Sequence, residues 1–538
     1  MTITEKPAAI IETHSISKPP DPEYEKKVLH NQGEDVSTFS RILAIYTRDA
    51  DTKEIYCINE KMGCDFENNW SYIKNVISSQ NCFTRQDNNL DEYLIPACDS
   101  NIFEKSLTQQ LKITEHHKKG ETQIRGCIIK VEISSPFNDW FIYHVLDQAR
   151  LHLHEKPIKK QKLSSPKYHE IFADFFANNF KNTIKGDEWE KCGRKYFIDK
   201  VKYFTDRYIK IECILPAFPC KSSNINKVGG VVPDKGEELA LRRLIQITEQ
   251  ARQLYPPGLK IWIVSDGHVF SDCIGVDDDI VDHYTSKLHA LYEKCKEEEN
   301  SDSIGFCGLN DLFFNGISSE SFDPTWIKGY HILHYTGTKI SSVSDASRQI
   351  LMKGCDTDDG TLRKDINIPN HPRLHLYRGF SRFMMEDLAL LPYFQDHSRK
   401  GFKKAIAKIA FNMIKRNDAY SNLVELMFPH HMRISIHAHK NSGPKFGVKV
   451  ISHEQCSIVR DLQNIDEPTF EDLLHIPTPW HNCVVKVAHG TDVEKENYFL
   501  TKSGVIKDAI ENGNYKGEWK DTCFVTGNGG CYEIMKFN

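Results

Sequence analysis

The chain has 538 residues, of which 40% are hydrophobic and 11% aromatic, so it can bury large cores and wholesale disorder is excluded. Its 69 basic and 74 acidic side chains give a formal net charge of −5, which argues against a nucleic-acid-binding protein that works through bulk charge. No run of about 18 apolar residues is present, so no membrane span is expected. Without a signal-like first segment or a CxxC pair among the 16 cysteines, we expect reduced thiols and a cytoplasmic location.

Composition divides the chain into three parts. Residues 1–35 are polar and rich in proline and charge, which predicts a disordered tail. Residues 36–165 contain strand-like segments at 41–47 and 126–134 and a helix-like segment at 140–154, which predicts an extra N-terminal α+β domain. This part ends in a lysine- and proline-containing stretch that is typical of a solvated linker. Residues 166–538 form the third part.

The sharpest signals of secondary structure follow this linker. Helices are predicted over 168–180, 236–255 and 280–299, and strands over 208–215 and 260–264. Strand, helix, strand and helix at this spacing form a βαβ unit, which predicts an α/β fold with a mostly parallel, Rossmann-like sheet. A further amphipathic helix is expected at 402–416, and the last hundred residues add a strand-rich C-terminal part.

Two polar loops follow successive strands of the predicted sheet. Ligands of open α/β sheets bind beyond the carboxyl ends of the strands, where such loops meet. The first loop contains the cation of Lys221 and the hydroxyl of Ser222, which suit a phosphate or a carboxylate. The second places Asp266 and Asp272 around His268, the residue types needed for proton transfer near neutral pH. The alternative for each loop is structural, since Asp-Gly is a common turn.

A strand over 432–439 would place four polar side chains on one face, and that face would line either solvent or a binding site. Two of them, His437 and His439, could hold a metal or form hydrogen bonds, but a third metal ligand at a fixed spacing is missing. The acidic triplet 277–279 falls where a helix begins, which favours helix capping over metal binding.

Two more segments combine special side chains with a defined spacing. Trp480 and His481 follow two prolines and would give a flat wall with a polar group beside it, suited to an aromatic substrate or to a packed turn. Arg378 and Arg382 are four residues apart on a predicted helix. They could clamp a phosphate, or pair with Glu386 at the surface.

Taken together, five ordered motifs resemble a known family. They are 215–224 (LPAFPCKSSN), 229–234 (GGVVPD), 265–272 (SDGHVFSD), 378–388 (RGFSRFMMEDL) and 478–482 (TPWHN). In this order they are similar to the pyoverdine/dityrosine biosynthesis family, also called isocyanide synthases. The likeness covers about residues 165–538, and the N-terminal part and the length resemble the fungal spore-wall dityrosine branch of that family.

This resemblance implies a reaction on an aromatic amino acid. Family members join the amino group of tyrosine or tryptophan to ribulose 5-phosphate, whose skeleton then fragments and leaves one carbon on nitrogen as an isonitrile. Fungal spore-wall members are associated with N-formyl-tyrosine, which a cytochrome P450 later couples into a dityrosine precursor. The implied activity is an isocyanide synthase-like lyase or transferase that acts on L-tyrosine for the spore or cell wall. Ribulose 5-phosphate is the implied co-substrate, and no metal or organic cofactor is implied.

The resemblance also implies roles for side chains. Proton transfer would fall to His268 with its flanking carboxylates, to His437 or to His481. Residues available to a sugar phosphate are Lys221, Ser222, Arg378 and Arg382. Residues that could border an aromatic ring are Phe218, Phe270 and Trp480. Lys221 could instead form a Schiff base if its pKa were lowered. Bacterial relatives often have arginine in place of His268; if that arginine binds phosphate, the assignment of His268 as a base is wrong.

Two other functions are compatible with the sequence. One is a glycosyltransferase-like enzyme that uses the acidic triplet with manganese and a nucleotide sugar, and a chelator would abolish its activity. The other is a non-catalytic scaffold with an enzyme-like core, which would tolerate replacement of Lys221, Asp266 or His481.

Overall fold

The computed structural model describes residues 167–536 with gaps at 207, 315–321, 328–331, 333, 354–356, 429–430, 444, 452–455, 460–461, 463–477, 489–496 and 521–528, together with short strands between residues 39 and 132. Among these strands, β1 (Phe39–Tyr46) pairs antiparallel with β2 (Lys53–Asn59) and with β8 (Ile128–Glu132). The strands expected at 41–47 and 126–134 are therefore confirmed. The tail, the helix expected at 140–154 and the linker before residue 167 lie outside the described residues.

The other strands of the N-terminal part form two small antiparallel sheets. Strand β4 (Leu90–Pro96) pairs with β3 (Phe83–Asp87) and with β5 (Gln110–Thr114), and β6 (His116–Lys118) pairs with β7 (Glu121–Gln123). The N-terminal part is thus strand-rich wherever the structure describes it.

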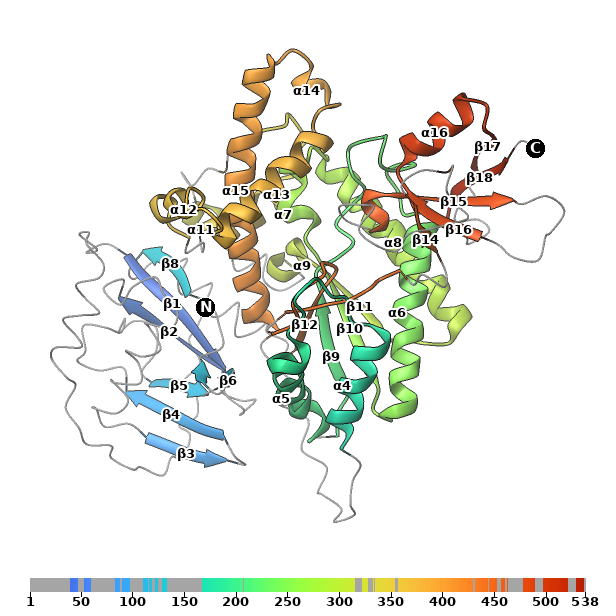
Figure 1. The fold of residues 1–538 in the computed structure, drawn as a ribbon. Coiled ribbons are helices and arrows are strands. Elements are labelled where there is room, and N and C mark those ends of the chain that lie inside the picture. The colour runs from blue at the N-terminus through green and yellow to red at the C-terminus, as the bar shows by residue number, and fades with distance from the viewer. Residues whose placement is uncertain are drawn as a thin grey trace.

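The centre of the core is a parallel sheet with the strand order β11-β10-β9-β12-β13. Its strands are β9 (Ile211–Leu215), β10 (Leu259–Ser265), β11 (Ile304–Gly308), β12 (Met432–Ser435) and β13 (Lys445–Gly447). Every residue of β9 is buried, which explains its continuous apolar run. Helix α6 (Lys235–Leu254) leads from β9 to β10, and α8 (Asp278–Glu299) precedes β11, so the predicted βαβ unit and parallel sheet are confirmed (Figure 1).

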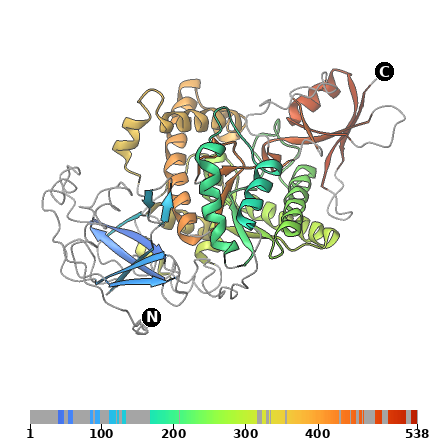
Figure 2. The same ribbon diagram turned by 60° about the horizontal axis from the view of Figure 1, so that its bottom comes forward.

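Aromatic side chains attach the first helices of the core to the sheet. Helices α4 (Tyr168–Asn179) and α5 (Arg194–Thr205) flank the π-helical turn η2 (Trp189–Gly193). Phe176 packs 4.6 Å from Phe197, measured between ring centroids, and both rings contact Phe446 of β13. Figure 2 shows these teal helices in front of the sheet.

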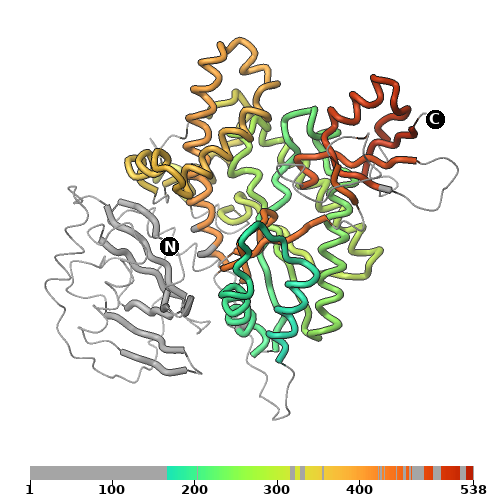
Figure 3. Tube along the Cα trace, viewed as in Figure 1, coloured from blue at the N-terminus to red at the C-terminus, as the bar shows by residue number. Residues whose placement is uncertain are grey.

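A helical layer covers the carboxyl ends of the strands. It consists of α7 (Gly267–Ile274), α9 (Leu309–Phe314), the 3-10 turn η3 (Pro324–Ile327), α11 (Ser342–Lys353), α12 (Asp359–Asp365), α13 (Pro372–Asp387), α14 (Pro392–Gln395) and α15 (Arg399–Met427). Helix α15 buries Ile406, Ile409 and Met413, as its amphipathic pattern predicts. Figure 3 shows the C-terminal end of this helix next to the central sheet. There, Tyr420 Oη donates to Val264 O at 2.9 Å.

A second, mixed sheet forms the C-terminal part, with the strand order β14-β16-β15-β18-β17. Its strands are β14 (Ser457–Ile458), β15 (Cys483–Ala488), β16 (Asn497–Thr501), β17 (Tyr515–Lys520) and β18 (Cys531–Lys536), and helix α16 (Ser503–Glu511) lies beside them. The expected strand-rich C-terminal part is therefore confirmed.

One detail of the prediction is wrong: the strand expected over 432–439 ends at Ser435, so the next residues form a loop and not an alternating polar face. Another is confirmed in part. The acidic triplet does begin a helix, with Asp277 at the N-cap position and Asp278 and Asp279 in the first turn of α8, but the Asp277 side chain does not cap it; its Oδ1 accepts a hydrogen bond from the Lys339 backbone at 2.9 Å. In the described part of the chain, no helix is both long and apolar enough to cross a membrane.

Candidate active site

Lys221, from the loop after β9, is enclosed by buried ion pairs. Its Nζ lies 2.7 Å from Asp234 Oδ2 and 2.7 Å from Glu237 Oε2, and it donates to Pro479 O at 3.1 Å. Asp234 and Glu237 also form the capping box of α6. Although burial by itself would lower the pKa of Lys221, the two carboxylates outweigh it and raise that pKa above the ordinary value. Lys221 is thus a cation that ties two loops to the start of α6.

The same loop packs under the segment that contains Trp480. The rings of Phe218 and Trp480 lie 4.8 Å apart, and both are fully buried. The backbone of Ser222 donates to Trp480 O at 2.8 Å. Phe218 has a φ of +54°, a left-handed conformation that is rare for an aromatic residue. The loop after β9 and the start of α6 therefore meet the segment around Trp480, which is far from both in the sequence.

Asp266 stands at the carboxyl end of β10, directly before α7. Its carboxylate does not cap the helix, and it forms no hydrogen bond or ion pair with any other residue in the described part of the chain. Burial raises the pKa of Asp266 to about 6, against the lowering effect of a hydrogen bond from its own backbone. A carboxyl group with this pKa and without a side-chain partner can both accept and donate a proton near neutral pH.

Asp272 lies within α7 itself and has a different environment. It belongs to a group of charged residues that we call the Asp272 network, which consists of Asp272, Asp278, His334, Arg348 and Arg416. Arg416 binds both carboxylate oxygens, with Nη2 at 2.8 Å from Oδ2, and His334 Nδ1 lies 2.8 Å from Oδ2. Burial favours the neutral acid, but Arg416 and His334 hold the pKa of Asp272 below its ordinary value.

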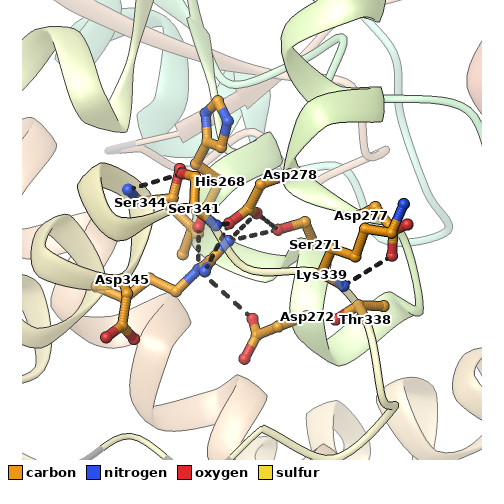
Figure 4. Close-up of polar contacts among 12 residues, drawn as sticks. His268, Ser271, Asp272, Asp277, Asp278, Thr338, Lys339, Ser341, Ser344 and Asp345 are labelled. Atoms are coloured by element: carbon orange, nitrogen blue, oxygen red, sulfur yellow. Dashed lines mark hydrogen bonds and ion pairs between the residues drawn. The ribbon is translucent and has the colours of Figure 1, made fainter.

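The rest of the Asp272 network fixes the corner between α7 and α8 (Figure 4). Arg348 is fully buried, donates to His268 O at 2.6 Å and to Ser271 Oγ at 2.5 Å, and forms an ion pair with Asp278. Asp278 Oδ2 also accepts the Ser341 backbone at 2.8 Å. Since every charge in this network is met by an opposite one, its geometry favours a structural role and gives no support to proton transfer by Asp272.

The ring of His268 is nearly buried and points away from Asp272 and Asp278 in Figure 4. Its Nε2 lies 3.1 Å from Asp282 Oδ1, without the geometry of a hydrogen bond. Burial lowers the pKa of His268, so the ring is neutral near neutral pH. The structure therefore separates the three polar residues of this motif: Asp266 at the strand end, His268 toward α8, and Asp272 in its network.

A second charged group lies between the first loop, the end of α13 and the start of α16. We call it the two-lysine cluster, and it consists of Ser222, Lys227, Glu386, Asp387 and Lys502. Lys227 forms an ion pair with Asp387 and lies 3.0 Å from Glu386 Oε2. Ser222 Oγ donates to Asp387 Oδ2 at 2.9 Å. The Ser222 hydroxyl, which was expected to be available to a substrate phosphate, thus donates to a carboxylate of the protein itself.

Lys502 is the least compensated cation of the two-lysine cluster. Its Nζ donates to the carbonyl oxygen of His481 at 2.7 Å. Burial and the nearby ammonium of Lys227 lower the pKa of Lys502 to about 8, against the opposing effect of Asp387 and Glu386. A substantial fraction of this amine is therefore uncharged at mildly basic pH.

Aromatic side chains border the two-lysine cluster. The ring of Phe383 lies 4.8 Å from the His481 ring at an angle of 84°, and Lys227 Nζ is 5.1 Å from the centre of the Phe383 ring. His481 thus contributes a carbonyl to Lys502 and a ring to Phe383. Sequence reasoning missed Lys227 and Lys502, because nothing in their local sequence distinguishes them from other lysines.

The remaining expected residues lie elsewhere. Arg378 and Arg382 are exposed on α13, and Arg382 Nε lies 3.7 Å from Glu386 Oε1, which is the surface alternative to a phosphate clamp. Phe270 is buried in the core, and His437 is exposed beyond β12. Over the described residues, no group of three or more His, Cys, Asp or Glu side chains is arranged to hold a metal ion.

Comparison with known proteins relates this site to a family. The model of the family described as pyoverdine/dityrosine biosynthesis protein matches residues 201–512. The spore wall maturation protein DIT1 of Saccharomyces cerevisiae is 60% identical over 510 residues, which is 95% of this chain and 94% of that protein. An L-tyrosine isonitrile synthase of Xenorhabdus nematophila is 31% identical over 311 residues, 58% of this chain and 76% of that protein.

One solved structure shares the architecture. The PvcA protein of Pseudomonas aeruginosa superposes with a TM-score of 0.51 at 24% identity, over 68% of this chain and 99% of that one. At this identity the likeness concerns the fold alone, and it agrees with the parallel sheet, the helical layer and the added strands described above.

Proposed function

The chain belongs to the pyoverdine/dityrosine biosynthesis family, and we propose that it converts L-tyrosine to its isonitrile or N-formyl derivative as an early step of dityrosine formation for the spore or cell wall. The observation that carries this proposal is the 60% identity, over 95% of the chain, to a protein named for spore wall maturation. The identity of 31% to an L-tyrosine isonitrile synthase supports the reaction type and the amino acid.

Ribulose 5-phosphate is the proposed one-carbon donor, and a cytochrome P450 is the proposed consumer of the product. Condensation of an amine with a ketone needs a proton for the departing hydroxyl, and fragmentation of the sugar skeleton needs a base. Asp266, with a pKa near 6 and no side-chain partner in the described structure, has the properties for such transfers. These steps require proton transfers and no redox change at the condensation, so the proposal includes no metal or organic cofactor.

The two-lysine cluster supports the same chemistry from a neighbouring position. Buried Cys220 lies in the first loop, and the carboxylates of Asp266 and Asp387 both raise its pKa, so both groups lie near this residue. Cations suit an anionic sugar phosphate, and the ring of Phe383 offers an aromatic surface to a phenol side chain. We therefore assign the substrates to the region between Asp266 and Lys502.

The direct test supplies purified protein with L-tyrosine and ribulose 5-phosphate that carries ¹³C at one carbon at a time. We expect mass spectrometry to show tyrosine with one added carbon that comes from a single position of the sugar. Analysis before and after mild acid, which hydrates an isonitrile to a formamide, identifies the product that is released. Folded protein that transfers no label to the tyrosine nitrogen would contradict the proposal.

The geometry gives no support to a manganese-dependent glycosyltransferase. Two carboxylates of the acidic triplet are engaged by the protein itself, Asp277 by the Lys339 backbone and Asp278 by Arg348. We expect label transfer to tyrosine to continue after prolonged treatment with EDTA, followed by gel filtration. Loss of transfer that manganese restores would favour the metal-dependent alternative.

A further inference from the structure

Three lysines of the site are buried or half-buried, and two of them, Lys221 and Lys502, have opposite surroundings. Lys221 sits between two carboxylates, at 2.7 Å from each, and is fully buried. Lys502 is partly accessible and has another ammonium, that of Lys227, as its strongest charged neighbour. The first environment stabilises the protonated amine, and the second favours the neutral, nucleophilic amine.

The structure keeps Lys227 close to Lys502 through several bonds. The Lys227 ammonium is anchored by Asp387 and by Glu386 Oε2. Its backbone carbonyl accepts a hydrogen bond from the Ser503 backbone at 3.3 Å, and the Asn226 carbonyl accepts one from Gly504 at 2.8 Å. The loop that carries Lys227 is therefore fastened to the first turn of α16, directly beside Lys502, so the repulsion between the two cations is not relieved by movement of the loop.

The position of Lys502 at the start of α16 adds a further effect. Lys502 occupies the N-cap position of this nine-residue helix. The N-terminus of a helix carries a partial positive charge and disfavours a neighbouring ammonium group. The hydrogen bond to His481 O orients the nitrogen through one N–H and leaves its lone pair available when the amine is neutral.

We propose that Lys502 forms a covalent imine with the ketose phosphate and passes it to the amino group of tyrosine. This inference rests on the proposed function, which supplies the ketose and the amine. The Lys502 nitrogen adds to the C2 carbonyl carbon, and the carbonyl oxygen leaves as water after accepting two protons. The tyrosine nitrogen then adds to the same carbon, and its two protons pass to the Lys502 nitrogen. The bond between C2 and the Lys502 nitrogen breaks with its electron pair on the lysine, which leaves a ketose–tyrosine imine and a free enzyme amine.

The advantage of this route is a better electrophile. A protonated imine is attacked by an amine faster than the parent ketone, and it is positioned before tyrosine reacts. The Lys502 nitrogen is hydrogen-bonded to the His481 carbonyl oxygen, and the His481 ring contacts Phe383, so an aromatic border lies next to the residue that holds the nitrogen. The tyrosine ring can use this aromatic border while its nitrogen attacks.

The first experiment traps the imine on the wild-type protein. Incubation with ribulose 5-phosphate and cyanoborohydride, without tyrosine, converts an imine to a stable secondary amine. We expect peptide mass spectrometry to find the ketose on Lys502, with the mass of the sugar phosphate less one oxygen. Lys507 on the same helix donates to Ile225 O at 3.2 Å and is the internal control for random glycation.

The second experiment uses variants. Lys502→Arg keeps the positive charge but cannot form this imine, and Lys502→Met keeps much of the side-chain volume. We expect each to reduce label transfer to tyrosine at least about a hundredfold, with a thermal midpoint close to that of the wild type. Lys507→Met is expected to retain transfer within about twofold.

The outcomes separate this inference from the proposed function. Label transfer by the wild type without an adduct on Lys502, or label transfer by Lys502→Met at the wild-type rate, overturns the inference and leaves the function. An adduct on Lys502 without label on tyrosine supports the reactive lysine and contradicts the function. Neither adduct nor label transfer from folded wild-type protein contradicts both.

Discussion

The Asp272 network and the two-lysine cluster contain similar side chains and lie near the same loops, yet they hold their protons differently. In the Asp272 network, Asp272 and Arg348 are both fully buried, and each charge meets at least one opposite charge. In the two-lysine cluster, Lys502 is partly accessible, and the charged group with the largest effect on its pKa is another cation, Lys227. Burial with full pairing fixes a charge, whereas partial burial beside a like charge makes a proton easy to lose.

This difference sorts residues that look equivalent in the sequence. Asp266 and Asp272 flank the same histidine, but only Asp266 has its pKa raised toward neutrality, while that of Asp272 is lowered. Lys221 and Lys502 also differ, since the pKa of Lys221 is raised and that of Lys502 is lowered. The comparison assigns a structural role to fully buried, fully paired charges and a chemical role to groups whose pKa is shifted toward neutrality.

The largest effect is expected from Asp272→Asn. This change leaves the buried guanidinium of Arg416 without its carboxylate, which typically costs about 3–5 kcal/mol of unfolding free energy. Urea denaturation followed by circular dichroism measures the loss. The matched control is Glu518→Gln, which removes a solvent-exposed partner of Lys520 on β17 and should leave the unfolding free energy unchanged within the error of the measurement. Equal stability of the two variants would show that the Asp272 network is not a structural support.

In contrast to Asp272→Asn, Asp266→Asn is expected to reduce activity without loss of stability. If Asp266 transfers protons, label transfer falls by about 10²- to 10⁴-fold. Because folding raises the pKa of Asp266 from 3.8 to about 6, the folded state binds more protons than the unfolded one, and this residue makes stability fall as pH rises across that interval. Asparagine removes this penalty, so unfolding free energy at pH 7 should be unchanged or higher.

The pH dependence sharpens this test. If ionised Asp266 is the base, the rate of label transfer by the wild type rises as pH passes about 6, and this step is absent in Asp266→Asn. A second rise near pH 8 is expected from loss of the Lys502 proton. A step near pH 6 that persists in the variant would assign it to another group.

A smaller effect is expected from Phe383→Ala. The Phe383 ring contacts His481 and lies over the Lys227 ammonium, so it is placed to border the tyrosine ring. Loss of this contact should raise KM for tyrosine about tenfold, which corresponds to about 1.4 kcal/mol. Phe383→Leu keeps most of the apolar volume and should show a smaller rise. Steady-state kinetics at saturating ribulose 5-phosphate measures both values, and an unchanged KM in Phe383→Ala would place the tyrosine ring elsewhere.

The sequence contains enough information for the fold and for part of the site. Continuous apolar runs identify β9 and β10, and a 3.6-residue period identifies α6 and α15, because these local patterns depend only on which faces are buried. The meeting of the loops after β9 and β10 follows from parallel strand direction. The strand ending at Ser435 is an exception, since alternation continues in the sequence after the last backbone pairing.

The two-lysine cluster could not be predicted in this way. Lys227 and Lys502 come together because the first turn of α16 bonds to the carbonyls of the loop 226–227, a contact between distant segments that leaves no periodic signal. The buried ion pairs of Lys221 could not be predicted either. The two carboxylates that neutralise it belong to a helix cap, and a capping pattern predicts where a helix starts without indicating a buried cation.

The smallest effect is expected where the sequence suggested a phosphate clamp. Arg378 and Arg382 are four residues apart and share a helical face, as predicted, but it is the face opposite to the buried Asp387. Both are exposed, and Arg382 is 3.7 Å from Glu386, so replacing both by methionine should change unfolding free energy by less than about 1 kcal/mol and KM for ribulose 5-phosphate by less than about twofold. Kinetics at saturating tyrosine measures this KM. A tenfold increase would show that these arginines bind the phosphate after all, which would shift the sugar from the two-lysine cluster to the outer face of α13.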